Sequence, residues 1–118
     1  MSVSKYRWTM EQALDVIRFI QPLLKEHKYH VALGGGVLNN GFSDKDLDLY
    51  FFPFDESKID PIMPFLETIW GKSEEINPNR EGYPADVNFE VKVKFGAKVP
   101  GEKRIDVFIT KNGVTPNV

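Results

Sequence analysis

The segment 33-LGGGVLNNGFSDKDLDLYFFP-53 constrains the fold of this chain more than any other. From residue 46 to residue 52, acidic or aromatic side chains alternate with apolar ones. Side chains two residues apart on a strand project from the same face, so the segment predicts a strand that buries Leu47, Leu49 and Phe51. Such a strand belongs to a sheet with one apolar face, and another layer of structure must cover that face.

The rest of the chain predicts helices around this strand and a hairpin towards the end. Thr9 to Gln12 has the pattern of a capping box, which places a helix over about residues 9–27, with either a kink or a restart one turn later expected at Pro22. A second helix is expected over residues 55–70. The other expected elements are a strand over 29–33, a helical turn over 37–40, a polar loop over 71–86 with or without an edge strand, a strand over 87–95, a turn over 96–103 and a strand over 103–110. This order predicts an α+β fold, close to an α/β sandwich, with helices mainly on one face of a small mixed sheet.

The composition is typical of one globular domain over residues 1–118. Apolar residues make up 42% of the chain and charged residues 27%, with a net charge of -2, so no positive excess favours binding to a long nucleic acid. The absence of cysteine excludes a disulfide scaffold, a thiolate zinc site and a cysteine nucleophile, and it suits a reducing compartment. No apolar run approaches the roughly 20 residues that cross a bilayer, so we expect a cytoplasmic protein without membrane association.

Three carboxylates form the strongest chemical signal. Asp46 and Asp48 project from the same face of the predicted strand, where like charges repel unless a cation lies between them. Asp106 lies inside the otherwise apolar segment 104-RIDVFIT-110, where an acid needs a partner. Hard carboxylate oxygens suit Mg²⁺ or Mn²⁺. The three aspartates therefore predict a metal site of the two-ion kind that serves in-line phosphoryl chemistry.

A second group of residues favours phosphate binding next to that metal site. A glycine-rich turn after a strand lets the backbone approach phosphate oxygens closely, and Gly34, Gly35 and Gly36 form such a turn. Ser43 and Lys45 flank the acids and would add a hydroxyl and a positive charge for a triphosphate. We therefore expect these five residues to hold the phosphates of a nucleotide.

Other interpretations of the same residues stay open. The glycines alone would suit a tight turn, and Asp46 and Asp48 would suit the solvated start of a strand. Asp44 is expected to be exposed or to cap a turn. Asp106 has alternative partners across a hairpin in Arg104, Lys92 or Lys94. A calcium loop of the EF-hand type is excluded, because Leu49 stands where that loop needs glycine.

The pattern Leu33-Gly34-Gly35, ten further residues and Asp46-Leu47-Asp48-Leu49 resembles the polymerase-β-type nucleotidyltransferase superfamily. That superfamily places a third carboxylate on a later strand, where this chain has Asp106. The resemblance implies a small mixed sheet that carries the site, and an NTP, with ATP among the candidates, as the donor. It also implies transfer of a nucleoside monophosphate to an acceptor hydroxyl with loss of pyrophosphate.

The resemblance assigns a role to each acid and leaves the acceptor open. Asp46 and Asp48 would bind two Mg²⁺ ions, and Asp106 would bind the catalytic ion and help to deprotonate the acceptor hydroxyl. Many members have Gly-Ser at the glycine turn. Most also have a C-terminal helical domain that binds the acceptor or the base, and we expect a homodimer or a partner protein to supply that binding surface here. The acceptor is a protein, a nucleic-acid end or a small-molecule hydroxyl. The alternative is a non-catalytic nucleotide- or protein-binding module that keeps the fold.

Overall fold

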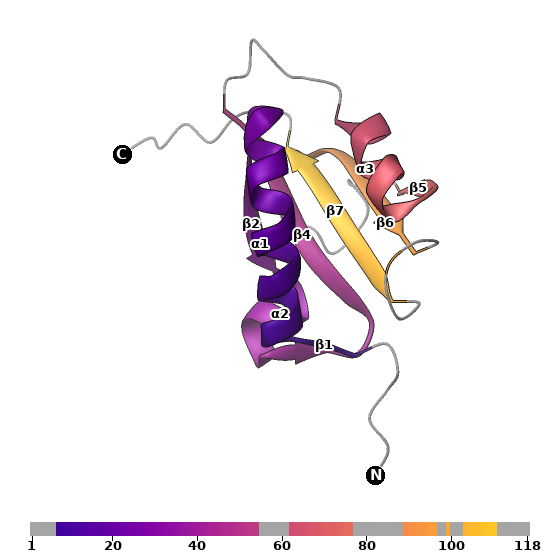
Figure 1. The fold of residues 1–118 in the computed structure, drawn as a ribbon. Coiled ribbons are helices and arrows are strands. Elements are labelled where there is room, and N and C mark those ends of the chain that lie inside the picture. Colours follow the sequence, from indigo (N-terminus) through magenta and orange to yellow (C-terminus); the bar gives the residue numbers. More distant parts are fainter. Residues whose placement is uncertain (1–6, 55–61, 77–88, 97–98, 100–102, 111–118) are drawn as a thin grey trace.

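The computed structural model describes residues 7–54, 62–76, 89–96, 99 and 103–110. Within these residues it has the expected α+β architecture, with helices on one face of a mixed sheet (Figure 1). In chain order, the elements are β1 (Trp8–Thr9), α1 (Met10–Glu26), β2 (Tyr29–Gly34), α2 (Gly35–Asn40), β3 (Phe42–Ser43), β4 (Asp46–Pro53), α3 (Met63–Trp70), β5 (Ser73–Ile76), β6 (Phe89–Phe95) and β7 (Arg104–Thr110).

Five strands form the main sheet in the order β2-β4-β7-β6-β5. The central pair, β4 and β7, is parallel, and every other pair in this sheet is antiparallel. The last strand of the described chain therefore lies between β4 and β6 and next to the strand that carries Asp46 and Asp48. A separate two-stranded ribbon of β1 and β3, which the sequence pattern did not predict, lies at one end of the molecule (Figure 1).

Helix α1 begins with the expected capping box. The Thr9 hydroxyl accepts a hydrogen bond from the Gln12 amide at 3.2 Å, and the Gln12 side chain accepts one from the Thr9 amide at 3.0 Å. A restart of the helix after Pro22, one of the two outcomes expected there, is wrong, because the helix continues through Pro22 to Glu26. Pro22 is exposed, whereas Ile20 and Leu24 on either side are fully buried, so packing of that face outweighs the loss of one helical hydrogen bond.

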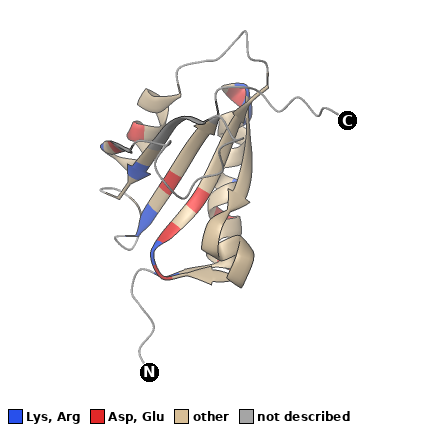
Figure 2. Cartoon of the chain, turned by 180° about the vertical axis from the view of Figure 1, so that it is seen from behind, with Lys and Arg blue, Asp and Glu red and all other residues tan. Residues whose placement is uncertain are grey.

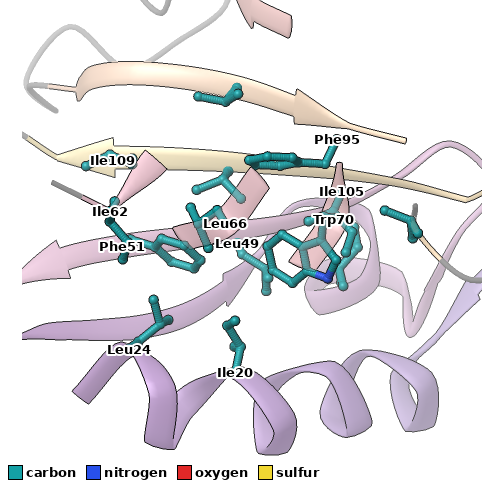
Figure 3. Close-up of a cluster of buried hydrophobic side chains, with 14 of the residues drawn as sticks. Ile20, Leu24, Leu49, Phe51, Ile62, Leu66, Trp70, Phe95, Ile105 and Ile109 are labelled. Atoms are coloured by element: carbon teal, nitrogen blue, oxygen red, sulfur yellow. The ribbon is translucent and has the colours of Figure 1, made fainter. Parts of the chain in front are cut away.

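The hydrophobic core lies between one face of the sheet and the helices α1 and α3 (Figure 3). Alternate residues of β4 face this core, as the sequence predicted. Its main members are Ile20, Leu24, Leu47, Leu49, Phe51, Leu66, Trp70, Val93, Phe95, Ile105, Val107 and Ile109. The second helix is described only from Met63 onwards, so the first part of the helix expected over 55–70 lies outside the described residues.

The remaining elements agree with the sequence in kind and differ at their ends. The helical turn expected over 37–40 begins earlier, at Gly35, and ends at Gly41, which has a positive φ of 84°. The loop expected over 71–86 contains the edge strand β5, and residues 77–88 lie outside the described part. No helix in the described part of the chain is long and apolar enough to cross a membrane.

Candidate functional site

One row of residues across the five-stranded sheet carries most of the candidate site. Each strand contributes one member, and neighbouring members are opposite each other in the strand register. From β2 to β5 the row consists of Gly34, Asp48, Asp106, Lys94 and Glu74. We call these five residues the charged row. Figure 2 views the sheet from the side away from α1 and shows acidic residues of the two central strands side by side.

Strand alternation places the three predicted acids on the face opposite the core. Leu47 and Leu49 are fully buried against the helices, so Asp46 and Asp48 must project from the other side of β4. On β7, Ile105 and Val107 face the core in the same way and turn Asp106 to the face that carries the β4 acids. Because β4 and β7 are parallel and in register, Asp48 and Asp106 are direct neighbours.

Lys94 is the basic residue that pairs with two of the acids. Its Nζ lies 3.5 Å from Asp46 Oδ2 and 3.5 Å from Asp106 Oδ1. Only 4% of the Asp106 side chain is exposed, against 21% for Asp46 and 27% for Lys94. A carboxylate buried to this extent needs a cation nearby, because ionising it away from water is costly. The alternative partner that the sequence offered for Asp106 is therefore present, and the second contact, to Asp46, was not foreseen.

The glycine turn lies against Asp48. Gly35 has a φ of +64°, in the left-handed region, and a side chain at this position would collide with the Asp48 carboxylate. A side chain at Gly34 would collide with the ring of Tyr50. The chain thus needs glycine at both positions to bring this backbone close to the acid. The structure brings the glycines and the acids together, as the sequence interpretation requires.

Ser43 and Lys45 occupy the other side of the turn. A side-chain carbon at Gly36 would lie 3.3 Å from Ser43 Cβ, so these two residues are in close contact. The Ser43 hydroxyl accepts a hydrogen bond from the Lys45 amide at 3.3 Å. Lys45 itself is exposed and lines a cavity of about 400 Å³, whose other lining residues are Asp44, Asp46, Lys94 and Arg104.

Asp44 lies outside the charged row, as expected for an exposed residue. It accepts hydrogen bonds from Arg7 Nε at 2.7 Å and from Arg7 Nη2 at 3.1 Å. The hydrogen bond from Arg7 and, to a lesser extent, its positive charge hold the pKa of Asp44 below its usual value. Asp44 thus has its own counter-ion, which separates it electrostatically from Asp46.

An aromatic pair lies beside the charged row and was not singled out in the sequence. Tyr50 and Phe108 follow Asp48 and Asp106 by two residues each, and they are opposite each other in the register. Their rings stack at 4.7 Å between centroids with an interplanar angle of 13°. The signal that could have found the pair is the shared spacing, an aromatic residue two positions after an acid on both strands. The stack gives the row an apolar neighbour.

The chemistry of the three aspartates fits Mg²⁺ or Mn²⁺, but their side chains are not yet arranged as a metal site. Among the described residues, no group of three or more His, Cys, Asp or Glu side chains is gathered so that it could hold a metal ion. Two of the carboxylates nevertheless converge on a single cation, the Lys94 ammonium, and the third is the register neighbour of Asp106. The donors are hard oxygens on adjacent strands, which is the set that these ions prefer.

Comparisons of the chain with protein-family models, curated proteins and solved structures gave no match. The case for a function therefore rests on the charged row and on the residues that surround it. These residues combine three aspartates, a glycine turn, a bridging lysine and a cavity with further basic side chains.

Proposed function

We propose that this chain is a metal-dependent nucleotidyltransferase of the polymerase-β type. It would transfer a nucleoside monophosphate from an NTP to an acceptor hydroxyl and release pyrophosphate. The observation that carries the proposal is the position of Asp46, Asp48 and Asp106 on one face of two adjacent parallel strands, with the glycine turn packed against Asp48. Sequence spacing alone led to the same set of residues.

The position of each acid suggests its role in the reaction. When Asp46, Asp48 and Asp106 bind Mg²⁺ or Mn²⁺, the ions supply Lewis acidity for an in-line displacement at phosphorus. Asp106 is the most buried of the three acids and lies within a central strand of the sheet, which suits a group that orients the acceptor hydroxyl and helps to remove its proton. Asp46 is more exposed and lies at the cavity, where the nucleotide would enter.

The surroundings of the acids suit a triphosphate. The cavity of about 400 Å³ falls within the range of about 300–1,000 Å³ that small-molecule sites occupy. Lys45, Lys94 and Arg104 line it, and their positive charges would attract a polyanion. Within the glycine turn, Gly35 lies against Asp48 and Gly36 lies against Ser43. Backbone amides of the turn and the Ser43 hydroxyl would therefore be near the phosphates.

One observation favours a second candidate, a non-catalytic binding module. The Lys94 ammonium already lies at ion-pair distance from both Asp46 and Asp106, so part of their negative charge is offset without a metal ion. In that case the cavity would bind an anion or a partner protein, and divalent metal would have no effect. Dependence of nucleotide binding on metal therefore separates the two candidates.

The test is a thermal-shift and calorimetry panel with ATP, GTP, CTP and UTP, each with and without Mg²⁺. It compares wild type with Asp46→Asn/Asp48→Asn. The matched control is Asp15→Asn/Glu26→Gln, which removes the same charge from exposed positions on α1. We expect Mg²⁺-dependent binding of a nucleotide by wild type and control, and its loss in the site variant. Binding that ignores Mg²⁺, or no binding of any nucleotide, would reject the transferase in favour of the binding module.

A further inference from the structure

We propose that Lys94 is a built-in counter-ion that competes with divalent metal for the aspartates, so that metal binds only when the lysine ammonium leaves them. This inference rests on the proposed metal site and adds a means of regulating it. In this account Lys94 offsets part of the charge of the acids until nucleotide arrives. Metal and nucleotide then bind together more tightly than either binds alone.

The position of the ammonium is the first argument. Lys94 Nζ is 3.5 Å from a carboxylate oxygen of Asp46 on β4 and 3.5 Å from one of Asp106 on β7. A cation shared by these two strands would lie between the same two carboxylates. The ammonium occupies carboxylate oxygens that a metal ion would need as ligands, so the ammonium and the metal ion compete for the same atoms.

The second argument is that Lys94 has another place to go. Glu74 on the edge strand β5 is its register neighbour on the side away from Asp106, and Glu74 is exposed. Lys94 borders both the 400 Å³ cavity next to the acids and a second cavity of about 290 Å³ lined by Lys72, Glu74 and Gly96 among others. Side-chain rotation in a partly exposed lysine is fast, so the exchange is limited by free energy and not by rate.

The third argument concerns what the displaced ammonium gains. Metal alone offers Lys94 no new anion and must displace it from two carboxylates. A triphosphate in the cavity supplies new oxygens that the ammonium can contact, because Lys94 lines that cavity. Metal and nucleotide are then coupled positively through one side chain, and by linkage each raises the affinity of the other.

The experiment measures binding of Mn²⁺ without nucleotide, by the electron paramagnetic resonance signal of the free ion. It compares wild type, Lys94→Met and Asp46→Asn/Asp48→Asn. Methionine keeps the apolar stem of the side chain and removes the charge. We expect Lys94→Met to bind Mn²⁺ about tenfold more tightly than wild type, which is an ordinary size for coupling between two sites. The aspartate variant should bind none.

Two further variants keep the result interpretable. Lys72→Met removes the same charge from an exposed residue of the neighbouring cavity, and it should bind Mn²⁺ as wild type does. Lys94→Gln is a polar, neutral replacement, and it should behave like Lys94→Met if the latter folds poorly by circular dichroism. If Lys72→Met raised the affinity for Mn²⁺ as much as Lys94→Met does, the effect would come from the net charge of the protein, and the inference would be overturned.

The remaining outcomes separate this inference from the proposed function. If wild type and both Lys94 variants bind Mn²⁺ equally and the aspartate variant does not, the metal site stands and the counter-ion role is overturned. If wild type and both Lys94 variants bind no Mn²⁺, even with a nucleotide present, the proposed metal site is overturned and the inference falls with it. A nucleotide analogue should also raise the affinity of wild type for Mn²⁺ more than that of Lys94→Met.

Discussion

The two faces of the five-stranded sheet are built from alternate residues of the same strands, yet opposite forces govern them. On β4, Leu49 is fully buried against the helices, whereas its neighbour Asp48 lies in the charged row on the other face. The apolar face gains free energy from every side chain that it removes from water. The charged face gathers like charges and partly buries them, which opposes folding unless a cation compensates. Stability and candidate chemistry therefore lie on opposite sides of one layer.

The largest expected effect comes from breaking the apolar face. Leu49→Ala should lower the free energy of unfolding by about 2–5 kcal/mol, because it leaves a cavity at a fully buried position. Asp48→Asn next to it should have less than half that effect, since it keeps the side-chain shape and removes a like-charge contact with Asp106. Urea denaturation measures both. If Asp48→Asn destabilised the protein as much as Leu49→Ala does, the charged face would be part of what holds the fold.

A smaller effect is expected at the glycine turn, where two glycines allow a matched comparison. Gly35 and Gly41 both have positive φ, at 64° and 84°, so alanine at either should cost about 1–2 kcal/mol of backbone strain. A side chain at Gly41 has no atom within 4 Å, whereas one at Gly35 meets the Asp48 carboxylate. Gly35→Ala should therefore be the more destabilising and should alone weaken Mn²⁺ binding. If the two variants lost equal stability and bound Mn²⁺ with equal affinity, Asp48 would not be a ligand of the metal ion.

The smallest expected effect concerns Asp44, at the edge of the charged face. Its pKa is lowered by the hydrogen bond from Arg7, so its contribution to stability is present above the unfolded pKa of about 3.8 and disappears as the pH falls through the lower folded value. Wild type should melt slightly above Asp44→Asn at neutral pH, and the difference should vanish in acid. A difference that grew as the pH fell would contradict a stabilising contribution of the Arg7–Asp44 ion pair. High salt should also reduce this difference in melting temperature, because the side chains of both partners are in contact with water.

The sequence predicted the parts of the fold that depend on local periodicity. Alternation over 46–52 identified which face of β4 is buried, and the Thr9 to Gln12 capping box located the start of α1. It did not predict the β1–β3 ribbon, because strands of two residues leave no periodic pattern. It also left open a restart of the helix after Pro22, whereas α1 runs through that residue to Glu26.

The acids of the candidate site were predicted from the sequence, and Lys94 was among the partners expected for Asp106, but the contact of Lys94 with Asp46 was not predicted. Asp106 faces Asp48 because β7 pairs with β4, a condition that the sequence raised but could not settle. The bridging role of Lys94 depends on the register of β6 against β7 and on the parallel order of β7 and β4 together. The consecutive strands β6 and β7 must be aligned with β4, which is distant in the sequence, before one ammonium can reach two carboxylates, and no local pattern encodes that long-range alignment.

The most direct test of the central claim is a crystal structure with Mn²⁺ and a non-hydrolysable NTP analogue, measured at a wavelength where manganese scatters anomalously. The account predicts an anomalous peak coordinated by Asp46, Asp48 and Asp106, with the Lys94 ammonium moved from the carboxylates to the phosphates. A Lys94 ammonium that still bridges Asp46 and Asp106, with no manganese at the charged row, would contradict both the metal site and the exchange.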